Sequence, residues 1–554
     1  MRISKVKLRN FRCFKELDIE EFAHTHALIG ENGSGKTAIL EGINMVTTKG
    51  LPHLNEQDFN NSDEEADLSI EVVFDEPFLV MIPDGYATQD IPCQSILMTA
   101  HRHEKAAAGK ALSDPFVIER YTVPLEYDNQ NIPTIPVGDK TVNIPSSVTK
   151  TASGYESPRK GGSTFKFTTN RLTLQNDTIN LPDVFYFDRE REEQAKVGYN
   201  SLLQKIAKDL NWRYRKDWNK ADIENKWNEF YNVVISTVED PKGARVIQPI
   251  RDKLKKIAGV DFSDLELGLL DIEQPFSRTF FSRRNKTNQI EQKRFGSGIS
   301  ILLAYFLLDT ISKLSKERVI FLIDEPELHL HPQLQHSLFR EFQESTFQTI
   351  YTTQSDCFIS IANWQSISRF QLDFSVCPKP TELQEVLEGK KLFNHLDEIK
   401  KWYQHQSIFF REDNQIFFAK KCLLVEGPAE KYGLPVLSQK SGKNIGDITI
   451  ISCNGKSKIP YYQMLCKAFG VPFFTLFDLD GKNATDDENK RPFNWANASA
   501  RFTFTSSFEK LFGIDKDADN KASKLFLKID ETKTTEIPED ISKALTAIEN
   551  WSKI

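Results

Sequence analysis

The chain of 554 residues lacks the marks of several protein classes. Its seven cysteines form no Cys-x-x-Cys pair, which argues against a zinc ribbon or a disulfide scaffold and is typical of a reduced, intracellular protein. The longest apolar stretch, residues 299–308, is far shorter than the roughly 20 residues that span a bilayer. The first residues alternate apolar and polar and form no signal-peptide core. We therefore expect a cytoplasmic protein with no membrane association.

The chain also lacks an excess of positive charge. Lys and Arg number 71 against 78 Asp and Glu, which gives a formal net charge of −7. This balance excludes a histone-like protein that coats DNA, but it is compatible with local basic grooves. The hydrophobic fraction of 39% excludes a wholly disordered chain and is enough for several buried cores.

A glycine-rich loop near the N-terminus predicts a nucleotide site. Residues 30–37 read Gly-Glu-Asn-Gly-Ser-Gly-Lys-Thr, which fits G-x-x-x-x-G-K-[ST] between a predicted strand and a predicted helix. Backbone N–H groups of such a loop turn inward around phosphate oxygens, and the helix N-terminus adds partial positive charge. We expect Lys36 to reach the β- and γ-phosphates of ATP and Thr37 to hold Mg²⁺. The remaining predicted contacts come from the loop residues Asn32, Gly33, Ser34 and Gly35.

A second half of this site is predicted far along the chain. The apolar residues 319–323 form a predicted buried strand that ends in Asp324 and Glu325. We expect Asp324 to orient the shell of the metal ion and Glu325 to polarise the attacking water. A Ser-Gly step at Ser297 precedes a predicted helix at 299–314 and is either a further anion site or a plain N-capped helix.

Carboxylates also end two strands of the C-terminal part. The apolar residues 422–425 stop at Glu426, with Glu430 four residues on, and residues 473–477 stop at Asp478 and Asp480. In a parallel sheet the carboxyl ends of strands share one edge, so we expect these side chains to converge. With no obvious counter-cation they repel one another unless a divalent metal, Mg²⁺ or Mn²⁺, binds between them. The intervening Gly455-Lys456 step is an alternative contact for a DNA backbone.

These motifs resemble two known families. The phosphate loop, the Ser297 motif and the opening residues 8–14 (Leu-Arg-Asn-Phe-Arg-Cys-Phe) are similar to the RecF/SMC-like branch of ABC-type ATPases, in which the signature motif contacts the γ-phosphate held by a second subunit. Residues 327–332 match the position of its D-loop, and Gln57 is a candidate for its Q-loop. Glu-Gly-x-x-Glu at 426–430 with Asp-x-Asp-Gly at 478–481 resembles the Toprim domain.

One position departs from the ATPase pattern. After the predicted strand at 349–352 the family usually has Thr-His-Ser, but this chain has Gln354 in place of the histidine. Glutamine forms a hydrogen bond to a phosphate oxygen or to water but carries no proton or positive charge. The departure predicts slow hydrolysis or a mainly regulatory role for ATP.

The order of the two domains is similar to that of the overcoming-lysogenization-defect (OLD) family of nucleases. The resemblance implies an α/β fold, with an ABC-type, RecF/SMC-like P-loop ATPase domain that carries a helical insertion, followed by a Toprim α/β domain. The predicted segments are the N-terminal part of the ATPase with a β-rich lobe (1–189), a helical insertion (190–260), the C-terminal part of the ATPase (261–377), a linker (378–417) and the Toprim nuclease domain (418–554). The insertion is either a surface-packed helical arm or a dimerisation element.

The OLD resemblance further implies roles for individual residues. Cleavage of DNA by a two-metal mechanism would use Glu426, Asp478 and Asp480, with Glu430 and Glu509 as further metal ligands. A lysine would balance charge in the transition state, and we expect Lys521, with Lys524 as the alternative.

The leading interpretation is an ATP-regulated, metal-dependent DNA endonuclease or nickase. Family resemblance implies anti-phage defence similar to that of Gabija-type nucleases, a homodimer or higher homo-oligomer, and a helicase-like or other defence-system partner. A non-cutting DNA-repair or clamp-type ATPase with a structural Toprim domain is the alternative. Topoisomerase or primase activity is a third interpretation, although the chain is short for either.

Overall fold

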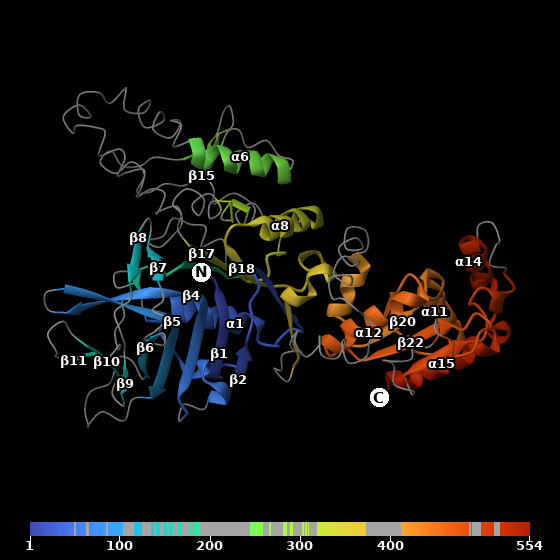
Figure 1. The fold of residues 1–554 in the computed structure, drawn as a ribbon. Helices are drawn as coiled ribbons and strands as arrows, with labels where there is room; N and C mark the ends of the chain where they lie inside the picture. Colours follow the sequence, from blue (N-terminus) through green and yellow to red (C-terminus); the bar gives the residue numbers. More distant parts are fainter. Residues whose placement is uncertain are drawn as a thin grey trace. The chain divides into compact units, whose positions relative to one another are not determined.

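The computed structural model covers the whole chain and describes most of it (Figure 1). The described residues are 1–48, 51–62, 66–84, 87–102, 116–124, 134–137, 140–143, 149–151, 154–158, 164–167, 178–179, 181–188, 244–258, 265–267, 281–284, 289–291, 302–303, 305–306, 309, 318–328, 330–372, 411–486, 489, 500–514 and 521–553.

An antiparallel sheet forms the N-terminal part of the fold. Its strands follow the order β2-β1-β4-β5-β6, and β12 also pairs with β4. The alternation of apolar and polar residues in β1 buries Val6 and Leu8 on one face, as predicted for a half-buried strand. The strands are β1 (Ile3–Phe11), β2 (Phe14–Ile19), β4 (Leu68–Asp84), β5 (Ala87–Arg102), β6 (Phe116–Pro124) and β12 (Thr178–Ile179).

A parallel sheet holds the strands that flank the nucleotide motifs. Its order runs β13-β17-β18-β3, and each neighbouring pair in this run is parallel. The central strands β17 and β18 are buried along their whole lengths, which accounts for the apolar run at 319–323. The bounds are β3 (Thr25–Gly30), β13 (Asp183–Phe187), β17 (Val319–Ile323) and β18 (Gln348–Thr352), with helices α1 (Lys36–Thr47) and α8 (Pro332–Glu344).

Helix α1 joins these two sheets into one core. It contacts β13 and β18 of the parallel sheet and β4 and β5 of the antiparallel sheet. Its buried residues include Ile39, Leu40 and Ile43. The helix that follows the phosphate loop is therefore fixed from both sides.

Further elements of the ATPase part are short, apart from α6. They are β7 (Thr134–Val137), β8 (Lys140–Asn143), β9 (Thr149–Thr151), β10 (Gly154–Pro158), β11 (Thr164–Phe167), α6 (Ala244–Ala258), β14 (Leu265–Leu267), β15 (Phe281–Arg284) and β16 (Gln289–Glu291). The predictions for residues 190–243, Ser297 and most of the helix at 299–314 lie outside the described residues, as does most of the predicted linker.

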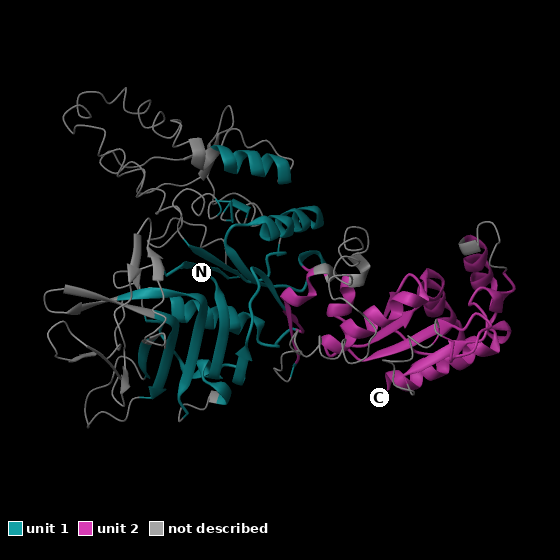
Figure 2. Ribbon diagram, viewed as in Figure 1, with its two compact units in different colours: residues 1–28, 32–358, 372–374 teal, residues 29–31, 359–371, 375–554 magenta. Residues whose placement is uncertain are grey.

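The chain divides into two compact units (Figure 2). The first consists of residues 1–28, 32–358 and 372–374, and the second of residues 29–31, 359–371 and 375–554. No helix among the described residues is both long and apolar enough to cross a membrane.

The second unit contains a parallel sheet with the order β21-β20-β22-β23. The predicted parallel arrangement of the strands that end in carboxylates is therefore present. Its strands are β20 (Cys422–Val425), β21 (Thr449–Ser452), β22 (Phe473–Asp478) and β23 (Arg501–Phe504). Its helices are α11 (Pro428–Ser441), α12 (Ile459–Ala468), α14 (Lys521–Glu531) and α15 (Glu539–Ser552), and β19 (Ile367–Phe370) also belongs to this unit.

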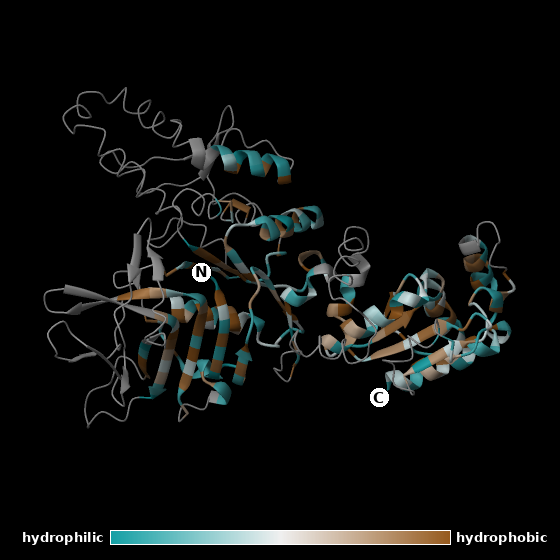
Figure 3. Ribbon diagram, in the orientation of Figure 1, coloured by the Kyte–Doolittle hydropathy of each residue, from teal (hydrophilic) through white to brown (hydrophobic). Residues whose placement is uncertain are grey.

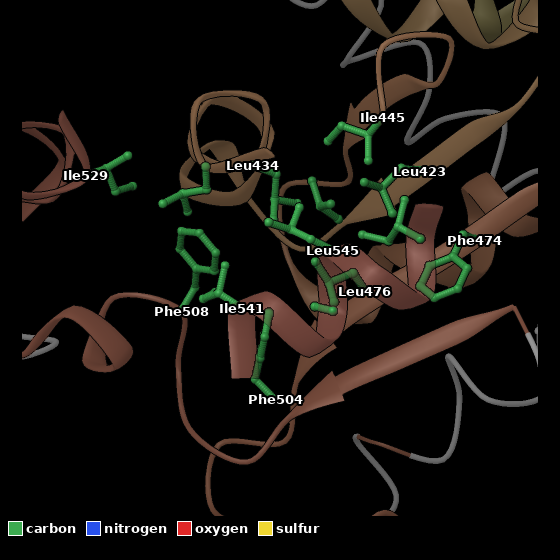
Figure 4. Close-up of a cluster of buried hydrophobic side chains, with 14 of the residues drawn as sticks. Leu423, Leu434, Ile445, Phe474, Leu476, Phe504, Phe508, Ile529, Ile541 and Leu545 are labelled. Atoms are coloured by element: carbon green, nitrogen blue, oxygen red, sulfur yellow. The ribbon is translucent and has the colours of Figure 1, made fainter. Parts of the chain in front are cut away.

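Helices cover both faces of this sheet. Leu423 and Leu476 pack with residues of α11, α14 and α15 in one hydrophobic cluster (Figure 4). Thr475, on the opposite face of β22, accepts a hydrogen bond from Gln463 of α12 at 2.9 Å. Figure 3 shows hydrophobic residues along β20 and β22 and a mixture of hydropathies along α15. The cores hold the strands rigidly, so the residues at their carboxyl ends are fixed in place.

Candidate functional site

The phosphate loop has the backbone that its glycines predict. Gly33 and Gly35 have φ of +83° and +89°, in the left-handed region that favours glycine. A Cβ at Gly35 would lie 2.4 Å from Cζ of Phe14 and 2.6 Å from Sγ of Cys13. Only glycine fits at this position, because the loop passes directly over the residues that follow β1.

Two side chains of the loop are buried with polar groups that suit a phosphate. Ser34 is fully buried, and its hydroxyl has no hydrogen-bond partner among the described residues. Lys36, the first residue of α1, is also buried. A buried hydroxyl without a partner costs free energy, and a phosphate oxygen would satisfy it. This arrangement fits a nucleotide.

Thr37 lies against the acidic end of β17. Its hydroxyl donates to Oδ1 and Oδ2 of Asp324 at 3.1 and 3.2 Å. Thr352, the last residue of β18, also donates its hydroxyl to Oδ1 of Asp324 and accepts a hydrogen bond from the backbone N–H of Glu325 at 2.9 Å. The structure thus brings together the two predicted halves of the nucleotide site. Sequence reasoning missed Thr352, a buried polar residue at the end of an otherwise predictable strand.

Gln354 contacts two acidic residues of the β17 end. Its side-chain Nε2 donates to Oε1 of Glu325, and its backbone N–H donates to Oε1 of Glu327, each at 2.7 Å. Burial raises the pKa of Glu327, and the neighbouring Glu325 adds to the shift. The glutamine therefore holds the Glu325 carboxylate directly, as a neutral donor with no proton to transfer.

The other residues predicted for the nucleotide site or near it make no described contact with Asp324 or Glu325. Asn32 is exposed in the loop, and Gln57 is exposed in a 3-10 turn, Glu56–Asp58. His331 caps the N-terminus of α8 by accepting from the backbone N–H of Gln333 at 3.4 Å. Ser297 is not among the described residues.

In the second unit, Glu426 and Asp478 lie together at the carboxyl ends of β20 and β22. Oε2 of Glu426 accepts from the backbone N–H of Asp478 at 3.4 Å, and Oδ2 of Asp478 accepts from the backbone N–H of Phe508 at 2.9 Å. Oδ1 of Asp478 is buried and has no hydrogen-bond partner among the described residues. One carboxylate oxygen of Asp478 therefore receives no hydrogen bond from the residues that the structure describes.

Five carboxylates interact electrostatically at this edge. Burial raises the pKa of Glu430 to about 8, and Asp478, Glu426 and Glu509 add to the shift. Burial likewise raises the pKa of Asp478 to about 7 against the backbone hydrogen bond from Phe508, and the other acids, including Asp480, contribute. We call Glu426, Glu430, Asp478, Asp480 and Glu509 the carboxylate cluster.

The carboxylate cluster has the ligand types of a divalent metal site but not a complete set of converging ligands. Carboxylate oxygens are the ligands that Mg²⁺ and Mn²⁺ prefer, and the orphaned oxygen of Asp478 suits a cation. Among the residues that the structure describes, however, no three Asp, Glu, His or Cys side chains converge tightly enough to hold a metal ion. The carboxylates are the right type of ligand for a divalent ion, but their side chains would have to rotate to coordinate one together.

The expectation that this cluster has no counter-cation is wrong. Lys456, in the 3-10 turn Lys456–Lys458 after β21, donates to Oδ2 of Asp480 at 2.8 Å and to Oδ1 of Asn489 at 3.1 Å. The sequence feature that could have predicted this counter-cation is a lysine directly after a Gly turn at the end of a strand. Lys456 thus forms an internal ion pair, and the predicted alternative for Gly455-Lys456, a contact to a DNA backbone, stays a prediction.

The two lysines proposed from family resemblance lie on α14. Lys524 is exposed. Lys521 is the first residue of the helix, and its side chain is outside the described part of the structure. The prediction for the Lys521 side chain therefore lies outside the described part of the structure, and Lys524 is described only as an exposed residue of the helix.

Comparisons with known proteins agree with this geometry. Residues 1–359 match the family model described as AAA ATPase domain, and residues 417–480 match the overcoming lysogenization defect protein-like TOPRIM domain. The first match shows that the chain belongs to the AAA ATPase domain family, and the second carries the predicted resemblance to OLD proteins in its TOPRIM domain. The predicted fold class, an α/β ATPase domain followed by an α/β TOPRIM domain, is confirmed. Such domains use a nucleotide and a divalent metal.

Individual relatives include two curated nucleases. The OLD nuclease of Thermus scotoductus (strain ATCC 700910 / SA-01) is 22% identical over 555 residues, which cover 94% of this chain and 93% of that relative. The Old nuclease of Escherichia phage P2 is 24% identical over 219 residues, 37% of this chain and 36% of that relative. Among solved structures, an SMC head bound to the C-winged helix domain of ScpA is 14% identical, covers 68% of this chain and 97% of its own, and superimposes with a TM-score of 0.39.

Proposed function

We propose that the protein is a divalent-metal-dependent DNA endonuclease or nickase whose cleavage is controlled by the state of its nucleotide. The observation that carries this proposal is the carboxylate cluster, in which the buried Asp478 has one oxygen without a hydrogen-bond partner among the described residues. Buried carboxylates that raise one another's pKa are costly to keep without a function.

In this proposal, Glu426, Asp478 and Asp480 hold Mg²⁺ or Mn²⁺, with Glu430 and Glu509 as further ligands. When bound, the metal would activate water and stabilise the leaving oxygen of a phosphodiester. The protein fixes Asp478 through the backbone N–H of Phe508. Lys521, or Lys524 in its place, would balance charge near the reacting phosphate.

The nucleotide site would use residues of both its halves, the phosphate loop and the acidic end of β17. We propose that Lys36 and residues 32–35 bind the phosphates of ATP, and that Thr37 and Asp324 hold its Mg²⁺. Glu325, held by Gln354, would orient the attacking water. Ser297 of a second subunit would complete the site, which requires a homodimer or a higher homo-oligomer.

We propose further that this nuclease serves in anti-phage defence in the cytoplasm, together with a helicase-like or other partner. The similarity to OLD nucleases, one of them from a phage, supports this context. The second candidate function is a non-cutting DNA-repair or clamp-type ATPase. It is favoured by one observation, that no three acidic side chains of the described residues form a ready metal site.

Cleavage of supercoiled plasmid separates these candidates. The wild type, Asp478→Asn and the exposed control Glu539→Gln would be incubated with Mg²⁺ or Mn²⁺, with and without ATP. We expect metal-dependent nicking or cutting that Asp478→Asn loses and Glu539→Gln keeps, and the ATP comparison gives the sign of control. Cleavage that Asp478→Asn retains would show that the reaction does not use the carboxylate cluster. Metal binding with no cleavage under any nucleotide condition would favour the non-cutting ATPase.

A further inference from the structure

We propose that Lys456 is a resident counter-cation of the carboxylate cluster. Lys456 holds Asp480 while no divalent ion is bound, and it competes with such an ion for Asp480. The inference rests on the proposed metal-dependent function. Its consequence is that one ion pair sets the metal concentration at which the site fills.

The lysine of this ion pair is buried, whereas the side chain of Asp480 is 27% exposed. The side chain of Lys456 is 10% exposed, and its ammonium lies 2.8 Å from Oδ2 of Asp480. Oδ1 of Asn489 accepts a second hydrogen bond at 3.1 Å. An ammonium taken out of water at this depth needs such partners, since its desolvation otherwise costs several kcal/mol. Lys456 is therefore held in place and does not simply lie along the surface.

The backbone on both sides of the pair fixes its position. Gly455, with φ of +123°, donates its N–H to the carbonyl of Glu426 at 2.8 Å, so the turn that carries Lys456 is anchored to the end of β20. Asn489 is fully buried and donates Nδ2 to the carbonyls of Leu479 and Asn483 at 3.3 and 3.0 Å. Two separate loops thus aim the ammonium at Asp480.

The two cations compete at Asp480. The ammonium donates a hydrogen bond to Oδ2 and neutralises one charge, whereas a divalent ion needs carboxylate oxygen lone pairs and full negative charge. The other acids of the cluster attract the divalent ion, and Lys456 opposes it both by occupying Oδ2 and by repulsion. Removal of the positive charge should therefore strengthen metal binding.

The test is calorimetric titration of the full-length protein with Mn²⁺, without nucleotide and without DNA. We expect Lys456→Gln to bind Mn²⁺ about tenfold more tightly than the wild type, and Lys458→Gln, a matched change in the same turn, to bind as the wild type does. In an Asp480→Asn background, Lys456→Gln should no longer tighten binding. A second readout is the melting temperature in EDTA, which Lys456→Gln should lower and Mn²⁺ should restore.

Either of two results for Lys456→Gln would overturn the proposal. Unchanged Mn²⁺ affinity would show that Lys456 does not compete with the metal, and weaker affinity would show that Lys456 supports the metal site. If Lys456→Gln does not fold, Lys456→Arg replaces it, and its forked guanidinium should hold Asp480 more firmly and weaken Mn²⁺ binding severalfold. Arginine with wild-type affinity would contradict the competition. These outcomes do not depend on DNA cleavage, so a protein that binds Mn²⁺ but cuts no DNA would refute the nuclease proposal alone.

Discussion

The hydroxyl of Thr37 lies 3.1 Å from Oδ1 of Asp324, although 287 positions separate the two residues. Thr37 is the second residue of α1, the helix that follows β3, and Asp324 follows β17. Because β17, β18 and β3 are parallel neighbours, their carboxyl ends meet at one edge of the sheet. The contact joins the phosphate loop to the acidic strand end.

Replacement of Lys36 by Ala should weaken ATP binding at least about tenfold. The buried ammonium would be lost from the place where phosphate charge accumulates. Titration of a fluorescent ATP analogue measures the effect. Lys15→Ala removes an exposed lysine from β2 and should bind as the wild type does, whereas equal binding by Lys36→Ala would exclude this loop as the nucleotide site.

Replacement of Glu325 by Gln should lower the ATP turnover number about 100-fold and leave ATP affinity nearly unchanged. The change removes the base that would orient and polarise water but keeps the size of the side chain. Phosphate release under saturating ATP measures it, with the exposed Glu344→Gln as the control. Turnover at the wild-type rate would show that another residue positions the water.

Gln354 should control turnover through its hydrogen bond to Glu325. Gln354→Ala removes the donor at 2.7 Å, and Gln354→Glu places a second negative charge beside the carboxylate. We therefore expect turnover to fall from Gln to Ala to Glu, by about tenfold at the first step. The same phosphate assay, run at equal nucleotide occupancy, gives this order, and a faster Ala variant would indicate that Gln354 restrains hydrolysis.

Arg120 should contribute to stability by capping the helix of the phosphate loop. Its guanidinium, 1% exposed, donates to the carbonyls of Thr48 and Met45 at 2.9 and 3.0 Å, at the C-terminal end of α1. Two hydrogen bonds from a charged donor make Arg120→Met destabilising by about 2–4 kcal/mol. Denaturant unfolding of the first transition measures this, and Arg102→Met, at an exposed position, should change stability by about 0.5 kcal/mol or less.

The metal-free protein should become less stable as the pH rises. The pKa of Glu430 is about 8 and that of Asp478 about 7 in the folded chain, while unfolded carboxyls titrate near about 4. Between these values the folded state binds more protons than the unfolded state, so stability falls with increasing pH from about 4 to about 8.

Melting temperatures in EDTA across this range measure the effect. Glu430→Gln should flatten the dependence because its neutral amide titrates nowhere in the range, and the exposed Glu531→Gln should not. Mn²⁺ should also flatten the dependence in the wild type. A melting temperature that rises with pH in EDTA would contradict the raised pKa values.

The sequence alone determined the class of each site. The spacing of glycines, Lys36 and Thr37 predicts a phosphate loop because backbone freedom and a helix N-terminus are local properties. The acidic ends of β20 and β22 likewise predict a shared edge once the strands are taken as parallel. The matches to an AAA ATPase domain and a TOPRIM domain agree with the P-loop ATPase and Toprim domains that these motifs predict.

Only the tertiary structure decided how charge is balanced within these sites. Lys456 pairs with Asp480, and Gln354 pairs with Glu325. In each case the two loops follow different strands of one sheet and meet at the edge of that sheet. No local pattern encodes such a pairing, since a lysine after a Gly turn suits solvent, DNA or a carboxylate equally well. Burial decides among them, because a buried charge is stable only beside its partner, and burial depends on the packing of the whole unit.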